Sequence, residues 1–169
     1  DPRQAMQLAE KAHSSAQTEG YANGMNRSTT ITGIAQYKID RYDKARIYFD
    51  EAIKSSTESN DTATLCFSTY WKGNLELHIG EYSKALDLYQ QVFSWATTTK
   101  DQYNLARAID GKASIYEALN ENEKATDYYE QALKIAQETQ FKEWIPTVLF
   151  SRSEEHTSEL QSRGLISYA

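Results

Sequence analysis

The chain has 169 residues, with 24 acidic against 18 basic side chains and a net charge of −6, an excess that argues against a surface built for nucleic acid. Mean hydropathy is −0.71, and no apolar run approaches the roughly 18 residues that would cross a membrane. One cysteine excludes an internal disulfide framework, and seven glycines with two prolines favour long helices over a turn-rich β-fold.

The sequence repeats itself when it is compared with itself at a shift of 40 positions. Alanine recurs in phase, and an aromatic residue follows each alanine by four positions, which places both on one face of a helix. The alanines are Ala45, Ala85 and Ala125, and the aromatic residues are Phe49, Tyr89 and Tyr129. A helix pair with one apolar stripe cannot bury it alone, so we expect neighbouring pairs to stack.

The same period predicts the order of the helices. In chain order, we expect one helix at about 2–18, helix pairs within 21–60, 61–100 and 101–140, and a cut first helix at 141–151. Residues 1–20 would then be the second half of a unit. A short polar turn separates the helices of each pair, and we expect Asp43 to cap the second helix of the first pair.

The last stretch departs from this pattern. Residues 152–169 read RSEEHTSELQSRGLISYA, which resembles the translation of a sequencing-library adapter. We therefore expect a non-native tail at 152–169, a repeat array at 1–151, and a coding sequence that was cut near Ser151. In this interpretation His156 carries no functional weight.

Three stretches in phase resemble the signature of the tetratricopeptide repeat (TPR). They are Gly33…Tyr42-x-x-Ala45-x-x-x-Phe49-x-x-Ala52, Gly73…Tyr82-x-x-Ala85-x-x-x-Tyr89 and Ala113…Ala125-x-x-x-Tyr129-x-x-Ala132. The departures are Thr32, Lys72 and Lys112 where the family has leucine, and Asn122 where it has tyrosine. The resemblance implies an all-α fold, a TPR-like α-solenoid in which antiparallel helix pairs form a right-handed superhelix. The period is longer than the one usual for the family, which is about 34 residues, so we expect longer helices.

The resemblance also implies that the first helix of each pair lines a concave groove that takes a protein or peptide segment. Positions that keep their phase but change their chemistry between units are the candidates for binding a partner. They are Arg27, Phe67 and Arg107; Thr30, Tyr70 and Asp110; Ile34, Asn74 and Ser114; and Tyr37, Leu77 and Glu117, with Lys38 and His78 beside them. A solvated face whose residues drift would give the same pattern, and Phe67, Tyr70 and Tyr37 could equally be core aromatics.

No catalytic residue, cofactor or metal is expected. The chain has no phosphate-binding glycine loop and no nucleophile elbow. Cys66 and His78 do not share a helical face, so we expect Cys66 to be a buried small side chain. His13 falls in an interior phase. A chaperone-type carboxylate clamp is not expected either, because Asp110 brings the wrong charge.

The sequence thus predicts a protein–protein interaction module. The favoured version is the sensory or regulatory TPR region of a larger bacterial protein, and a stand-alone scaffold or adaptor is the alternative. An enzyme with a solenoid body is the alternative from another class. We expect no nucleic-acid partner and no membrane partner within this fragment, whereas its uncapped ends could self-associate. A cytoplasmic location is favoured, although the fragment lacks a true N-terminus.

Overall fold

The computed structural model describes residues 1–139, and within this range the chain forms seven α-helices. They are α1 (Pro2–Thr18), α2 (Ala22–Tyr37), α3 (Tyr42–Glu58), α4 (Thr62–His78), α5 (Tyr82–Thr99), α6 (Gln102–Ala118) and α7 (Asn122–Glu138). The predicted order of helices is confirmed over this range. The helix expected at 141–151 and the tail at 152–169 lie outside the described residues.

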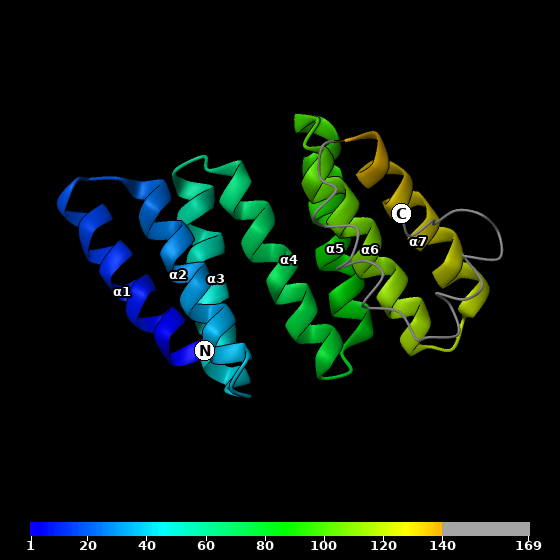
Figure 1. Cartoon of the computed structure of the whole chain (residues 1–169), viewed down its shortest axis with the longest axis horizontal. Helices are drawn as coiled ribbons and strands as arrows, with labels where there is room; N and C mark the ends of the chain where they lie inside the picture. The colour runs from blue at the N-terminus through cyan, green and yellow to red at the C-terminus, as the bar shows by residue number, and fades with distance from the viewer. Residues whose placement is uncertain (140–169) are drawn as a thin grey trace, which may run out of the picture.

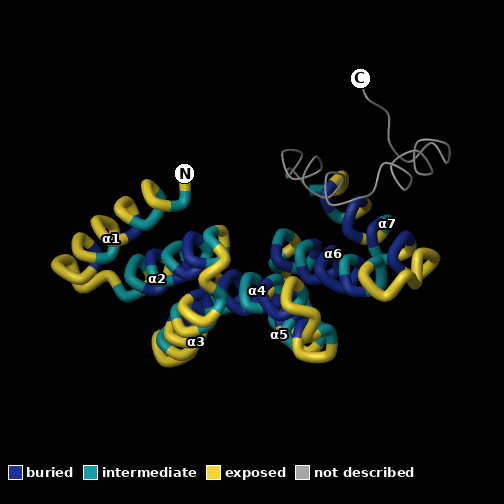
Figure 2. Tube along the Cα trace, turned by 90° about the horizontal axis from the view of Figure 1, so that it is seen from below, coloured by how far each residue is buried: buried dark blue, intermediate teal, exposed yellow. Residues whose placement is uncertain are grey.

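The helices form two layers of a curved array. Each helix packs on its neighbours in sequence, and α2, α4 and α6 also contact one another from unit to unit. Figure 1 shows the consecutive helices side by side, and Figure 2 shows α2, α4 and α6 on the hollow side with α3 and α5 on the outer side. We call α2, α4 and α6 the inner helices, and α1, α3, α5 and α7 the outer helices. The predicted all-α solenoid is confirmed.

The same turn ends each of the first six helices and recurs at a constant interval along the chain. A backbone N–H just beyond the helix donates to a carbonyl five residues earlier, as from Arg41 to Gln36 at 3.0 Å. The residue before that donor has a left-handed φ between 55° and 83°. These residues are Gly20, Asp40, Asn60, Gly80, Lys100 and Asn120. Glycine, asparagine and aspartate adopt this conformation most readily, so the turn is encoded locally at every position except Lys100.

The capping prediction for Asp43 is wrong. The outer helix α3 begins at Tyr42 after Arg41, which makes no side-chain cap, so Asp43 lies inside the first turn. There its negative charge interacts favourably with the N-terminal end of the helix dipole, but the side chain does not cap the helix. Side-chain caps occur instead on α1, α4 and α6: Asp61 Oδ1 accepts the Thr64 N–H at 3.1 Å, Asp101 caps α6 in the same way, and Asp1 caps α1.

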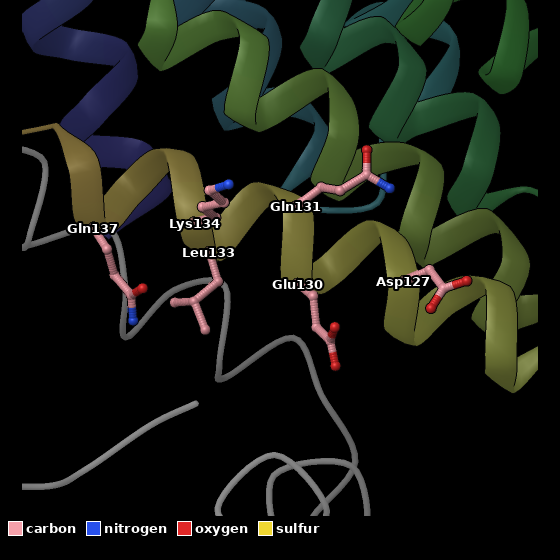
Figure 3. Close-up of a pocket in the computed structure, with 6 residues that line it drawn as sticks. All are labelled: Asp127, Glu130, Gln131, Leu133, Lys134 and Gln137. Carbon is pink, nitrogen blue, oxygen red and sulfur yellow. The ribbon is translucent and has the colours of Figure 1, made fainter. Parts of the chain in front are cut away.

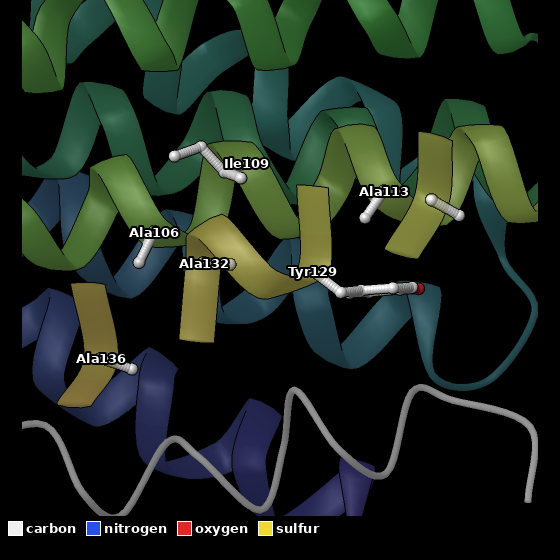
Figure 4. Close-up of a cluster of buried hydrophobic side chains, with 7 residues drawn as sticks. Ala106, Ile109, Ala113, Tyr129, Ala132 and Ala136 are labelled. Atoms are coloured by element: carbon white, nitrogen blue, oxygen red, sulfur yellow. The ribbon is translucent and has the colours of Figure 1, made fainter. Parts of the chain in front are cut away.

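Large aromatic side chains of the outer helices fill the space between the layers. Phe49, Tyr89 and Tyr129 are all 0% exposed, and Figure 4 shows Tyr129 of α7 extending among the small side chains that α6 and α7 present. A Cβ placed on Gly73 or Gly111 would lie 2.6 Å from Cε1 of Tyr89. The Tyr89 ring therefore lies between the backbones of α4 and α6, and only glycine allows that approach.

Candidate functional site

Three side chains at equal positions in successive units meet on the inner helices. They are Arg27 on α2, Phe67 on α4 and Arg107 on α6, and each lies one full repeat after the last. The Cζ atom of Arg27 lies 3.6 Å from the centroid of the Phe67 ring, and that of Arg107 lies 5.4 Å from it. Two guanidinium groups thus converge on one ring from the two neighbouring units. We call these three residues the arginine–phenylalanine cluster.

Further aromatic rings surround Arg107. Its Cζ lies 4.5 Å from the ring of Tyr103 and 5.1 Å from that of Tyr70. The face of an aromatic ring attracts a guanidinium, and a guanidinium held against a ring keeps N–H groups at its edge that can bind an anion. The rings therefore position the two charges and leave donors for a further group.

The cluster holds positive charge without an opposite charge in direct contact. Among residues 1–139, neither Arg27 nor Arg107 forms a salt bridge. Burial and the nearby charge of Arg107 lower the pKa of Arg27, whereas Tyr103 and Asp61 act against that change. Asp61 uses Oδ1 to cap α4, and its Oδ2 makes no hydrogen bond in the described range. Arg27 nevertheless stays charged at neutral pH.

A second cluster lies at the opposite end of α2 and α4. The ring centroid of Tyr37 is 5.6 Å from that of His78 and 6.2 Å from that of Trp71, and Tyr42 lies 5.2 Å from His78. The Tyr42 hydroxyl donates to Asp40 Oδ1 at 2.6 Å, so the 2.8 Å contact with His78 requires a proton on Nε2 of the histidine. The hydrogen bond to Asp40 raises the pKa of Tyr42 to about 12.

A row of rings on α4, completed by Tyr37 of α2, joins the two clusters. Phe67 and Trp71 are one helical turn apart, with ring centroids 6.5 Å from each other, and His78 lies two turns further on. The ammonium group of Lys38 lies 5.9 Å from the Trp71 ring. The inner face thus offers an aromatic strip with cationic side chains at both ends.

Comparisons with known proteins agree with this architecture. Residues 65–138 match the family model described as tetratricopeptide repeat. This part of the chain therefore consists of tetratricopeptide repeats. Residues 28–78 also match the model of anaphase-promoting complex subunit 5.

A solved relative has the same TPR-like fold. The chain is similar to the crystal structure of BtubC (BKLC) from P. vanneervenii, with a TM-score of 0.73 and 17% sequence identity, over 98% of this chain and 72% of that one. At this identity the likeness concerns the fold alone. No curated protein sequence matches the chain.

The predicted binding residues fall into three groups according to their solvent exposure. Arg27, Lys38 and His78 are exposed. Half-buried positions are Ile34, Tyr37, Asn74, Leu77, Arg107, Ser114 and Glu117, and buried positions are Thr30, Phe67, Tyr70 and Asp110. Thr30 has no exposed surface, and its Oγ1 lies 2.7 Å from Oγ of Ser68 on α4. Thr30 therefore packs the inner helices together, and we leave it out of the proposed surface.

The change of residue from Ile34 to Asn74 to Ser114 has an internal cause. Ile34 packs on the apolar cluster that contains Phe49, whereas Asn74 accepts the Tyr89 hydroxyl at 2.6 Å. Ser114 lies 3.3 Å from the Tyr129 hydroxyl, which also donates to Glu117 at 2.7 Å. The inner residue thus matches the presence or absence of a hydroxyl on the outer ring. The sequence carries this signal between positions that are 15 apart, and a search at the repeat period alone misses it.

The remaining candidate chemistry in the TPR units has a packing role. Cys66 is 1% exposed, as predicted, and burial raises the pKa of its thiol to about 12. The Ser28 hydroxyl donates to a backbone carbonyl and lies 3.1 Å from His13 Nδ1, which joins α1 to α2. The described residues contain no group of three or more side chains suited to a metal ion and no helix able to span a bilayer.

A hollow on the surface of α7 is lined by residues of that helix alone. Figure 3 shows the side chains that line it: Asp127, Glu130, Gln131, Leu133, Lys134 and Gln137. All six come from one helix, so among the described residues no functional groups converge there from different elements. The arginine–phenylalanine cluster, which draws on three helices, is the better candidate.

Proposed function

We propose that the chain binds a segment of a partner protein on its inner helices, with the arginine–phenylalanine cluster as the main contact. The observation that supports this most directly is the approach of Arg27 and Arg107 to the Phe67 ring from two neighbouring units. Tetratricopeptide repeats generally serve as protein–protein interaction modules. Arginine and aromatic side chains are the types that contribute most of the binding energy at such interfaces.

The dimensions of the aromatic strip suit a short extended segment. Phe67 and His78 are eleven residues apart on α4, which corresponds to about 16 Å at the rise of an α-helix. An extended peptide covers that distance with about five residues. A segment of this length would touch both ends of the strip, and its aromatic middle would bury apolar side chains.

We also propose that this binding serves a regulatory role within a larger protein, in preference to a stand-alone scaffold. Sequencing the intact gene tests it. A kinase or helix-turn-helix domain encoded after residue 151 would support regulation, and a stop codon close to that position would favour the adaptor.

Peptide-array binding to the full chain, followed by Arg27→Ala and Arg107→Ala, tests the proposed face. Each substitution should weaken binding of the best array peptide by about tenfold, because each removes a charged donor from the contact. The matched control is Arg41→Ala in the turn between α2 and α3, where the side chain is exposed. If both cluster variants bind as tightly as the parent, the proposed face is wrong. Tyr70→Ala is a poorer test, since this side chain is only 9% exposed and its loss would disturb folding.

A further inference from the structure

We infer that the bound segment places an internal aspartate or glutamate side chain between Arg27 and Arg107. This inference rests on the proposed function, because it assigns the chemistry of the group that the same cluster receives. Three features of the cluster support it: an uncompensated pair of charges, donors that lack acceptors, and room for the peptide chain on both sides.

The first step is the charge. Arg107 lies close enough to lower the pKa of Arg27, and within residues 1–139 neither forms a salt bridge. Two like charges held at a ring by their neighbours repel each other, and a carboxylate between them would reverse the sign of that interaction. The net charge of the whole chain is −6, so the cluster is a local reversal of the general charge.

The second step concerns hydrogen bonds. Nε and Nη1 of Arg107 are buried and donate no hydrogen bond in the described part of the chain, so a carboxylate on the exposed Arg27 would reach them after a rotation of the Arg107 side chain. Buried donors without an acceptor cost free energy, and this cost is larger for charged groups. A carboxylate accepts two parallel N–H bonds from a guanidinium, a geometry that a backbone carbonyl cannot reproduce. The cluster thus lacks a hydrogen-bond acceptor for its guanidinium groups, and the carboxylate of an acidic side chain would supply one.

The third step is the path of the chain. On one side of the cluster, the row of rings continues from Phe67 through Trp71 and Tyr37 to His78. On the other side, Arg27 lines an open hollow of about 530 Å³ between α1, α2 and the start of α4, and its walls include Asn23 and the carboxylates of Glu19 and Asp61. A peptide can therefore extend past the arginine pair in both directions. This favours an internal acidic residue over a terminal carboxylate, which would end the chain at the cluster.

Selection from a peptide library tests the inference with the full chain. The probe is a randomised library of peptides of about 12 residues, long enough to exceed the aromatic strip, acetylated at the N-terminus and amidated at the C-terminus. We expect aspartate or glutamate to be enriched at one position of the selected peptides. For the tightest peptide, changing that residue to glutamine or asparagine should raise Kd about tenfold, as measured by fluorescence anisotropy.

Variants then locate the contact. With Arg27→Gln or Arg107→Gln, the same change in the peptide should alter Kd clearly less than tenfold, because one of the two partner charges is gone, and in the double variant it should alter Kd less than about twofold. The control Arg41→Gln removes the same charge from an exposed turn and should retain the full tenfold discrimination. Equal discrimination by all three variants would overturn the assignment to the cluster, as would selected peptides without acidic enrichment.

Two parallel libraries separate this inference from the proposed function. If only peptides with a free C-terminal carboxylate are selected, or only peptides with phosphoserine, the internal carboxylate is wrong and the binding face stands. If acidic enrichment is absent while Arg27→Ala still weakens binding, the inference fails alone. If no library yields a peptide that binds the full chain, the proposed function fails, and the inference fails with it.

Discussion

The inner and outer helices differ in what they bury. Each of the three outer helices α3, α5 and α7 buries a stripe of small residues with one large ring, and its other face is exposed. The inner helices bury polar side chains to the same depth, as at Asn26, Thr30 and Ser68, which are at most 2% exposed. On α6, the six consecutive residues 108–113 are all buried.

The difference follows from the number of neighbours. An inner helix contacts the outer helices before and after it and also the next inner helix, so little of its perimeter remains free. Polar side chains buried there find partners in each other, as with the hydroxyls of Thr30 and Ser68. The outer helices therefore provide most of the apolar packing, and the inner helices combine packing with the surface that meets a ligand.

The strongest test of this contrast is Tyr89→Ala on α5. The ring is fully buried between α4 and α6, so its loss should lower the free energy of unfolding by about 3–5 kcal/mol. The control is Ile47→Ala on α3, which removes an apolar side chain that is 64% exposed and should change stability by less than about 0.5 kcal/mol. Urea denaturation measures both. A similar cost for the two variants would refute the assignment of packing to the ring.

Alkaline pH should produce the next largest effect. Burial raises the pKa of Tyr70, Tyr89 and Tyr129, so these groups stay protonated in the folded state when the unfolded chain already ionises. Their stabilisation is complete below the unfolded pKa of about 10 and is lost as the pH rises above it. At about pH 10.5, each should remove about 1 kcal/mol of unfolding free energy. Urea titrations compare this pH with neutral pH, and Tyr89→Phe should show a shallower decline; an identical decline would contradict the assignment.

Gly111→Ala should destabilise the chain by about 1–3 kcal/mol. Alanine normally favours a helix over glycine, but the new Cβ would lie 2.6 Å from both Cε1 and Cζ of Tyr89 and would force the ring to shift. Thermal unfolding of Gly111→Ala in the parent and in a Tyr89→Leu background separates the two effects. The substitution should cost much less in the second background, and an unchanged cost would point to a cause other than the ring.

Tyr89→Phe should cost about 1 kcal/mol, because it leaves Asn74 Oδ1 without the hydroxyl that donates to it. The double variant Asn74→Ile with Tyr89→Phe reproduces the pair that Ile34 and Phe49 form in the first unit. The double variant should lose less unfolding free energy than the sum of the losses in the two single variants. A double-mutant cycle from chemical denaturation measures this coupling, and strict additivity would mean that the two positions vary independently.

Lys100→Gly should have the smallest effect and the opposite sign. Lys100 has a φ of 58°, a left-handed conformation that costs a residue with a Cβ about 1 kcal/mol. Glycine there should raise the free energy of unfolding by about 0.5–1 kcal/mol. The reciprocal control is Gly80→Ala, at a φ of 83°, which should lower the thermal midpoint. If both substitutions shift the midpoint in the same direction, turn geometry does not control stability here.

The outer helices were predictable from the sequence because their burial follows a simple period. The residues chosen by phase, among them Ala45, Phe49 and Tyr129, are fully buried. The inner helices were less readable, because a helix covered on most sides has no single apolar stripe. The caps were not predicted for a local reason: Asp61 and Asp101 precede inner helices, whereas the predicted cap, Asp43, follows the turn before an outer helix.

The candidate site was predictable in part. Arg27, Phe67 and Arg107 were selected because they share a phase, but their contact depends on how close the inner helices lie, which the sequence does not state. The variation among Ile34, Asn74 and Ser114 was ambiguous for another reason. A position can vary to suit a ligand or to suit its neighbour in the core, and only the contacts with the outer rings distinguish these causes.

Because the same turn recurs at the end of each of the first six helices, the chain can lose a whole repeat and keep the geometry of its turns. Asn60 and Lys100 end their helices with the same backbone geometry, so removal of 61–100 would join two compatible ends without an altered loop. The shortened protein would have α2 and α6 as adjacent inner helices and would lack Phe67. Arg27 and Arg107 would then be neighbours without the Phe67 ring that both contact. Loss of one repeat would thus keep the backbone geometry of the joint and remove the site.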